Sequence, residues 1–166
     1  MRFRSERLSE DHNVDDFASG NDALDDWLKR HAHHAAAMNT GRTFVWHSGE
    51  DRVVAYFTLA AHRVRRENVA RRAGRGSPIE IPAVLLARLA LHTNLHGQGL
   101  GGELLWDALT RTVAAGSIAA ARLIVVDAID DNAADFYEHH GFLPSPDDPH
   151  LLVQKLSDIA RSLGIS

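Results

Sequence analysis

The fold is decided by residues 85–115, which read LLARLALHTNLHGQGLGGELLWDALTRTVAA. Residues 84–91 form a short and mostly apolar segment, as in a strand that is buried in a sheet. Residues 103–115 carry leucine, alanine and valine at helical spacing, which predicts an amphipathic helix. Between these segments lie four glycines, at positions 97, 99, 101 and 102. Glycines before a helix let the backbone turn tightly and direct unpaired N–H groups outward, so this stretch predicts a phosphate-binding site.

These glycines allow three phosphate-binding interpretations and a fourth, in which they form a glycine-rich turn that binds no ligand. A P-loop requires Lys and then Ser or Thr after the last glycine, whereas Glu103 follows here. The dinucleotide pattern G-x-G-x-x-G is matched, but five residues separate the strand from the loop and only about 40 residues follow Asp127. The pyrophosphate loop of acetyl-CoA-dependent acetyltransferases, Arg/Gln-x-x-Gly-x-Gly/Ala, is matched over residues 96–101 except at His96.

Composition describes an ordinary globular protein with one unusual charge cluster. The chain has 166 residues, 45% hydrophobic and 24% charged, which predicts a single domain over residues 1–166. It has no cysteine, which excludes disulfides, thiol nucleophiles and cysteine metal sites. The charged N-terminal segment and the lack of a long apolar run lead us to expect a cytoplasmic protein without a membrane contact. The net charge is −4, yet residues 63–75 contain six arginines against one glutamate, which favours a polyanionic partner.

The remaining chain predicts a mixed α/β fold. Asn21 is a candidate N-cap for one helix that ends near Met38. Residues 123–126 are continuously apolar and β-branched, which predicts a buried strand parallel to the strand before the glycine loop. The other predicted elements are an edge strand at 3–8, a hairpin of strands 43–47 and 52–64, a helix at 132–140 ended by Gly141, and a final strand at 150–156.

Three histidines in the first helix raise the question of a metal site. Only His31 and His34 share a helix face, His33 does not, and no third ligand is near in the sequence. We therefore interpret these histidines as a solvated helix face and predict no metal.

The glycine loop and a second motif together resemble the GNAT N-acetyltransferase superfamily. The second motif is Asn-x-x-x-Phe-Tyr-x-x-x-Gly-Phe at residues 132–142, after the next strand. Residues 17–28 and 85–90 more narrowly resemble the TacT/AtaT-like branch, and the resemblance covers nearly the whole chain. It implies the GNAT fold, an α+β arrangement in which a mixed, mostly antiparallel sheet contains a splayed parallel strand pair and is flanked by helices. It also implies an acetyltransferase toxin of a toxin–antitoxin pair that acetylates the amino group of aminoacyl-tRNA. Such toxins are neutralised by a ribbon-helix-helix antitoxin and commonly form homodimers.

The resemblance also assigns residues to acetyl-CoA. Tyr137 matches the general acid that gives its proton to the departing thiolate. Main-chain groups on the strand before the loop would hold the pantetheine, and a backbone N–H of Leu89 or Ala90 would polarise the thioester carbonyl. The predicted acetyl-CoA contacts are Leu89, Ala90, Leu91, His96, Gly97, Gln98, Gly99, Leu100, Gly101, Gly102, Asn132 and Phe136. Because the phosphate contacts come mainly from backbone N–H groups, we expect acetyl-CoA binding to survive the departure at His96.

A tRNA acceptor gives the arginines a role, since guanidinium groups contact phosphates bidentately. The predicted tRNA contacts are Arg63, Arg65, Arg66, Arg71, Arg72, Arg75 and Arg88. No obvious general base stands out, and His92, His62 and Glu80 are open candidates. An α-amino group has a pKa of about 7.7–8, so it needs little help to lose its proton. The alternatives are a GNAT enzyme that acts on a small amine or a protein N-terminus, and a nucleotide- or acyl-CoA-binding regulatory module without catalysis.

Overall fold

The structure is a computed structural model that describes residues 3–164. The chain separates into two compact units, each described here by itself: unit 1 comprises Met1–Ala60 and Ala87–Ala108, and unit 2 comprises Ala61–Leu86 and Leu109–Ser166. The single domain predicted for residues 1–166 stays a prediction. No helix within residues 3–164 is long and apolar enough to cross a membrane.

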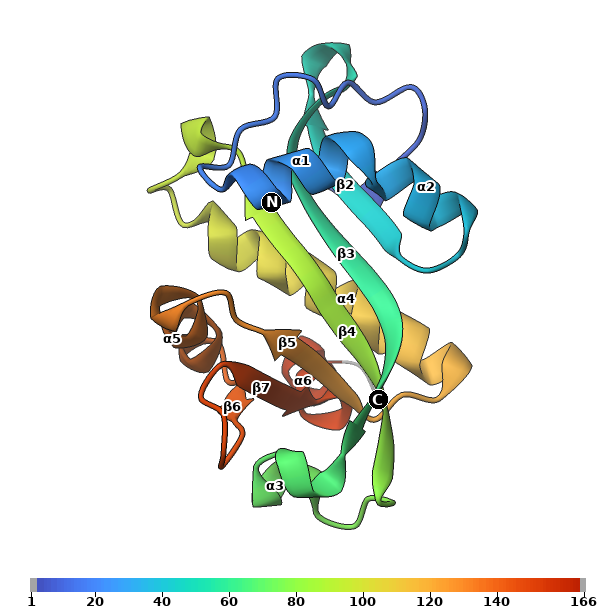
Figure 1. Ribbon diagram of the computed structural model, residues 1–166, viewed down its shortest axis with the longest axis vertical. Helices are drawn as coiled ribbons and strands as arrows, with labels where there is room; N and C mark the ends of the chain where they lie inside the picture. Colours follow the sequence, from blue (N-terminus) through green and yellow to red (C-terminus); the bar gives the residue numbers. More distant parts are fainter. Residues whose placement is uncertain (1–2, 165–166) are drawn as a thin grey trace. The chain divides into compact units, whose positions relative to one another are not determined.

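Figure 1 shows the strands and helices that the chain forms. In chain order they are β1 (Glu6–Arg7), α1 (Asp22–Arg30), α2 (Ala32–Ala37), β2 (Arg42–Ser48), η1 (Gly49–Asp51), β3 (Arg52–Arg65), η2 (Arg66–Asn68), α3 (Arg71–Gly74), β4 (Glu80–Leu91), η3 (Thr93–Leu95), α4 (Leu100–Ala119), β5 (Leu123–Asp127), α5 (Asp131–His139), β6 (Leu143–Pro144), β7 (Leu151–Lys155) and α6 (Leu156–Leu163). The hydrogen-bonded strand order is β1-β2-β3-β4-β5-β7-β6. The predicted mixed α/β fold is confirmed.

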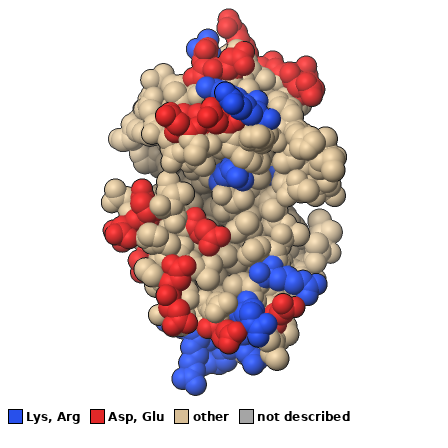
Figure 2. All heavy atoms as spheres, viewed as in Figure 1, with Lys and Arg blue, Asp and Glu red and all other residues tan. Residues whose placement is uncertain are grey.

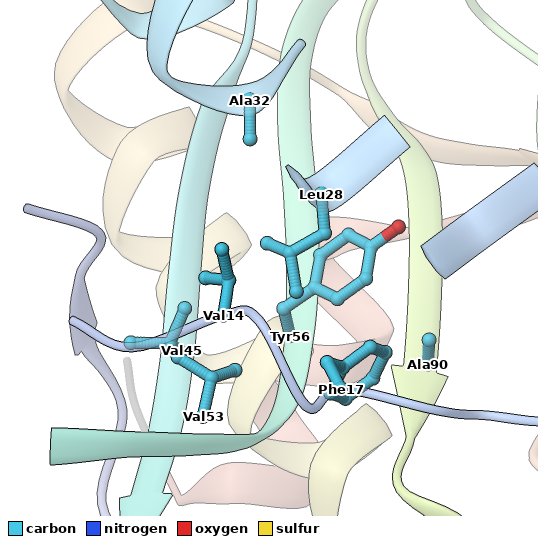
Figure 3. Packing of buried hydrophobic residues seen from close by; sticks show 8 residues of the cluster. All are labelled: Val14, Phe17, Leu28, Ala32, Val45, Val53, Tyr56 and Ala90. Carbon is cyan, nitrogen blue, oxygen red and sulfur yellow. The ribbon is translucent and has the colours of Figure 1, made fainter. Parts of the chain in front are cut away.

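Unit 1 contains an antiparallel meander covered by α1 and α2. β2 pairs with β1 and with β3, and Ser48 lies opposite Arg52 at the predicted hairpin. The core contains Phe17 from the N-terminal segment, Leu28 from α1 and Tyr56 from β3, all at most 1% exposed. Figure 3 shows these side chains packed together with Val14, Ala32, Val45, Val53 and Ala90.

The first helix begins as predicted but is shorter. The Asn21 side chain accepts a hydrogen bond from the Leu24 N–H at 3.1 Å, as an N-cap should. The prediction of one helix to Met38 is wrong, because the backbone at His31 (φ −124°, ψ −21°) separates α1 from α2. The break keeps Leu28 and Ala32 in one core cluster, and neither glycine nor proline marks it in the sequence.

Unit 2 contains the predicted parallel strand pair. Residues Ala83, Val84 and Leu85 of β4 pair in parallel with Leu123, Ile124 and Val125 of β5. β5 then pairs antiparallel with β7, which also pairs with β6. β4 begins at Glu80, four residues before the predicted start. The apolar run of β5 is explained by its burial, since residues 123–126 are at most 1% exposed.

Candidate functional site

The glycine loop in unit 1 has the geometry of an anion-binding loop. Gly97 and Gly99 have φ of +76° and +75°, a region that favours glycine. Apart from the glycine itself and its two chain neighbours, no heavy atom lies within 4 Å of the position a Cβ would take at either glycine, so the surroundings of the loop are open. α4 begins at Leu100, and the N–H groups of its first turn have no acceptor within the helix. These donors, with the helix dipole behind them, fit the pyrophosphate of acetyl-CoA.

His96 braces this loop. Its Nε2 lies 2.7 Å from the carbonyl oxygen of Leu91, and its backbone N–H donates to the Thr93 oxygen. The ring therefore joins the end of β4 to the loop, which gives the departure from Arg or Gln a structural role. Gln98 is held similarly, since its side-chain amide donates to the Asn94 oxygen at 3.2 Å.

The second half of β4 leaves main-chain groups available for a ligand. The N–H of His92 donates to the Val54 oxygen of β3 at 2.8 Å. Because successive N–H groups of a strand point to opposite edges, those of Leu89 and Leu91 point away from β3. The parallel register with β5 ends at Leu85, although β4 continues for six more residues.

Unit 2 carries the second motif on α5. The Asp130 carboxylate accepts from the Ala133 N–H at 2.8 Å and so caps the helix, and Asn132 is exposed in the first turn. Tyr137 is 9% exposed and packs edge-on against Phe136 and Phe142, with both ring centroids 5.3 Å away. Burial raises the pKa of Tyr137, so the phenol stays protonated at neutral pH. Across residues 3–164 its hydroxyl forms no hydrogen bond with another side chain or the backbone.

Gly141 ends α5 in the predicted C′ position. Its φ is +95°, and a Cβ there would lie 2.8 Å from Nε2 of Gln154 on β7. The left-handed backbone thus favours glycine, and a Cβ would in addition displace the end of the Gln154 side chain.

The arginine segment of unit 2 folds into η2 and α3 rather than an open loop. Figure 2 shows basic side chains gathered where Figure 1 places α3. All six arginines are exposed, and half of them are engaged: Arg63 lies 3.9 Å from Glu80, Arg65 2.7 Å from Glu67, and Arg66 donates to the Ser77 oxygen at 2.7 Å.

The other three arginines of residues 63–75 have no acidic partner among the described residues. Within the described part of the chain, Arg71, Arg72 and Arg75 form no ion pair. Residues of η2 and α3 line a cavity of about 750 Å³ that has apolar walls from Val69 and Ile79. Neighbouring unpaired cations repel one another, so this arrangement favours a polyanion that neutralises them.

Arg88 belongs to unit 1 and not to this cluster. Its guanidinium lies 4.0 Å from the centre of the Trp27 ring, a cation–π contact between β4 and α1. The sequence contains no signal that an arginine would cover Trp27.

The structure also decides the role of His92 among the candidate bases. Its Nδ1 accepts from the Asn94 N–H, and its Nε2 lies 3.3 Å from the Asp16 oxygen. The ring thus joins η3 to the N-terminal segment, and its one lone pair, on Nδ1, is taken by the Asn94 N–H. His62 is half-buried, and Glu80 faces Arg63.

A histidine cluster that sequence reasoning missed lies in unit 1. Nε2 of His12 and Nε2 of His47 lie 2.7 and 2.8 Å from one Glu6 oxygen, and these hydrogen bonds, that of His12 foremost, lower the pKa of Glu6. The Ser9 N–H donates to Nδ1 of His12, which places the proton of neutral His12 on Nε2. That proton occupies the nitrogen a metal would need, so the geometry describes a hydrogen-bonded cluster. The predicted helix histidines do not take part, and His33 contacts the Ser9 oxygen.

Comparison with known proteins gives one family and close structural likenesses. Residues 39–144 match the family described as acetyltransferase (GNAT) domain. The chain is 36% identical over 158 residues to a tRNA-acetylating toxin of Mycobacterium tuberculosis (strain ATCC 25618 / H37Rv), with 95% of each chain covered. A mutant of KacT has a TM-score of 0.90 at 22% identity, covering 98% of this chain and 99% of its own. AtaT in complex with acetyl-methionyl-tRNAfMet has a TM-score of 0.88 at 24% identity, covering 97% and 99%.

Proposed function

This chain belongs to the GNAT acetyltransferase family, and from that premise we propose that it is a toxin that acetylates the α-amino group of aminoacyl-tRNA and so blocks translation. The observation that carries the proposal is the 36% identity to a tRNA-acetylating toxin over 95% of both chains. The unpaired arginines on and beside α3 support it independently, because an acceptor of small size would not need them.

The acetyl transfer reaction gives a role to the glycine loop, to Asn132 and to the end of β4. Acetyl-CoA, the co-substrate, supplies the acetyl thioester. The loop N–H groups from Gln98 to Gly102 hold its pyrophosphate, and the exposed amide of Asn132 hydrogen-bonds its arm. The Leu89 N–H, which points away from β3, polarises the thioester carbonyl.

Proton transfer then completes the reaction. The neutral α-amine attacks the carbonyl carbon, the C–N bond forms and the C–S bond breaks. Tyr137 gives its phenolic proton to the departing sulfur, and the proton lost by the amine restores the phenol through solvent. Because burial raises the pKa of Tyr137, the phenol carries its proton before the sulfur departs.

The test is transfer of radiolabelled acetyl from acetyl-CoA to total charged tRNA. Uncharged tRNA and the Tyr137→Phe variant are the controls, since phenylalanine keeps the ring packing but carries no proton. We expect label on charged tRNA only, and loss of most of it in the variant. Acetyl-CoA binding without label on tRNA would instead favour the second candidate, acetylation of a small amine or a protein N-terminus.

Family membership also suggests how this chain is regulated and assembled. We propose that a ribbon-helix-helix antitoxin neutralises this chain, that the chain forms a homodimer, and that it acts in the cytoplasm where charged tRNA is found. The solved structure of an AtaT mutant bound to the C-terminus of the antitoxin AtaR supports an antitoxin partner. Growth arrest on expression, relieved by co-expression of a neighbouring antitoxin gene, tests it, and light scattering of the purified chain tests the dimer.

A further inference from the structure

Arg88 of β4 lies over the ring of Trp27, which is itself stacked on Tyr56 in unit 1. Its guanidinium lies 4.0 Å from the centre of the Trp27 indole, which in turn stacks on Tyr56 with 6.2 Å between ring centroids and 12° between planes. Tyr56 is fully buried, and its hydroxyl donates to the Leu24 oxygen at 2.6 Å. Figure 3 shows Tyr56 within the core cluster. The position of the guanidinium is therefore supported by α1 and by the core that holds Trp27.

This fixed cation lacks an anionic partner. Over residues 3–164, Arg88 forms no ion pair and no hydrogen bond with another residue. Asp25, a buried carboxylate of α1, is engaged with Ser19, from which it accepts the N–H at 3.0 Å and the hydroxyl at 2.7 Å. Arg88 is half-buried, and that burial lowers the pKa of its guanidinium. A partly desolvated guanidinium without an acceptor costs stability, and an apolar side chain on Trp27 would not have that cost.

The position of Arg88 indicates what its free donors contact. The residue directly precedes Leu89, whose N–H we assigned to the thioester carbonyl, so it lies on the strand beside the point of acetyl transfer. The acceptor proposed above is an aminoacyl ester on the last nucleoside of tRNA. The charged group nearest to its reacting amine is the phosphodiester on the 5′ side of that nucleoside. A planar guanidinium with free N–H groups suits a phosphate, which it can contact through two parallel hydrogen bonds.

We infer that Arg88, held on Trp27, binds the phosphodiester of the 3′-terminal nucleotide and thereby selects nucleotide-linked amines as acceptors. The inference rests on the proposed function, because it names the part of that acceptor which one side chain contacts. Arg88 acts here as a binding residue that fixes where the α-amine lies, and the unpaired arginines on and beside α3 contact other phosphates.

The experiment compares two small acceptors with the same amine. One is 3′-aminoacyl adenosine, and the other is the same compound with a 5′-phosphate. For the wild-type chain we expect kcat/KM to be about tenfold or more higher with the phosphate, as for one charge-assisted hydrogen bond. In Arg88→Gln this ratio should fall close to one. Arg30→Gln, which removes an exposed arginine of α1 from the same unit, should keep the wild-type ratio.

Two outcomes would overturn the inference while the proposed function stands. The wild-type chain could use both acceptors equally well, or Arg88→Gln could keep the wild-type ratio. Failure of the wild-type chain to acetylate charged tRNA is a separate result that counts against the proposed function. Thermal unfolding and acetyl-CoA binding of Arg88→Gln show that the comparison is made on folded protein, and Arg88→Lys tests the planar contact, because lysine keeps the charge and loses the fork.

Discussion

Replacement of Arg71, Arg72 and Arg75 together by glutamine should weaken tRNA binding and make it less sensitive to salt. These three arginines are exposed and unpaired within residues 3–164, so their full charge is available to phosphates. Each phosphate that a cation neutralises releases counterions, and the slope of log K against log salt changes by about 0.7–0.9 per phosphate. If each of the three contacts one phosphate, the slope should become shallower by about 2–3. Between 50 and 200 mM salt, a slope difference of that size corresponds to roughly a 20- to 60-fold difference in the loss of affinity.

The assay is filter binding of labelled charged tRNA across this salt range. A matched control replaces Arg7, Arg30 and Arg52, three exposed arginines of unit 1, by glutamine and so makes the same change in net charge. We expect the control slope to stay within about one unit of the wild-type slope. Equal flattening in both triple variants would mean that net charge, and not the α3 cluster, holds the tRNA, and the assignment of these arginines would be wrong.

Three further predictions concern α5 and the glycine loop. Gly141→Ala should lower the free energy of unfolding by about 1–2 kcal/mol, because of its φ of +95°; a melting temperature within a degree of wild type would contradict this. The hydrogen bond to Asp131 raises the pKa of His150. A group whose pKa is raised in the folded state adds stability at pH values below its unfolded-state pKa, and this added stability is lost as the pH rises through the folded-state pKa. The difference in melting temperature between wild type and His150→Gln should therefore be larger at pH 5.5 than at pH 8.5, and the opposite order would refute the pairing. His96→Ala should weaken acetyl-CoA binding by about two- to tenfold in calorimetry, as expected for one lost neutral hydrogen bond; a hundredfold loss would mean that the ring contacts phosphate itself.

Local chemistry explains which parts of the site the sequence predicts. The glycine loop and the cap of α5 depend on backbone conformations that only a few residue types adopt, so Gly97, Gly99 and Gly141 indicate them directly. The burial of β5 was predictable for a similar reason, since a short apolar run that is mostly β-branched favours a strand covered on both faces. The family match confirms the predicted acyltransferase class and its acetyl-CoA donor.

Tertiary contacts explain what the sequence does not predict. The break at His31 follows from packing on the core and has no local signal. Arg88 and Trp27 are 61 positions apart, and their stacking depends on how α1 lies on β4. The arginine segment appears uniform in the sequence, yet the structure divides it into residues that hold η2 and residues whose charge is free. Which arginine is available to a ligand is thus a property of the fold.

The engagement of His92 also bears on the choice of acceptor. With both nitrogens of His92 hydrogen-bonded, this imidazole is not free to take a proton from the attacking amine. At pH 7 roughly one α-amine in ten is already neutral, whereas fewer than about one lysine side chain in a thousand is. An enzyme that relies on solvent for this proton therefore gains most from an α-amine. The aminoacyl ester of tRNA offers such an amine next to a chain of phosphates, and it matches both the chemistry of the strand end and the unpaired arginines on and beside α3.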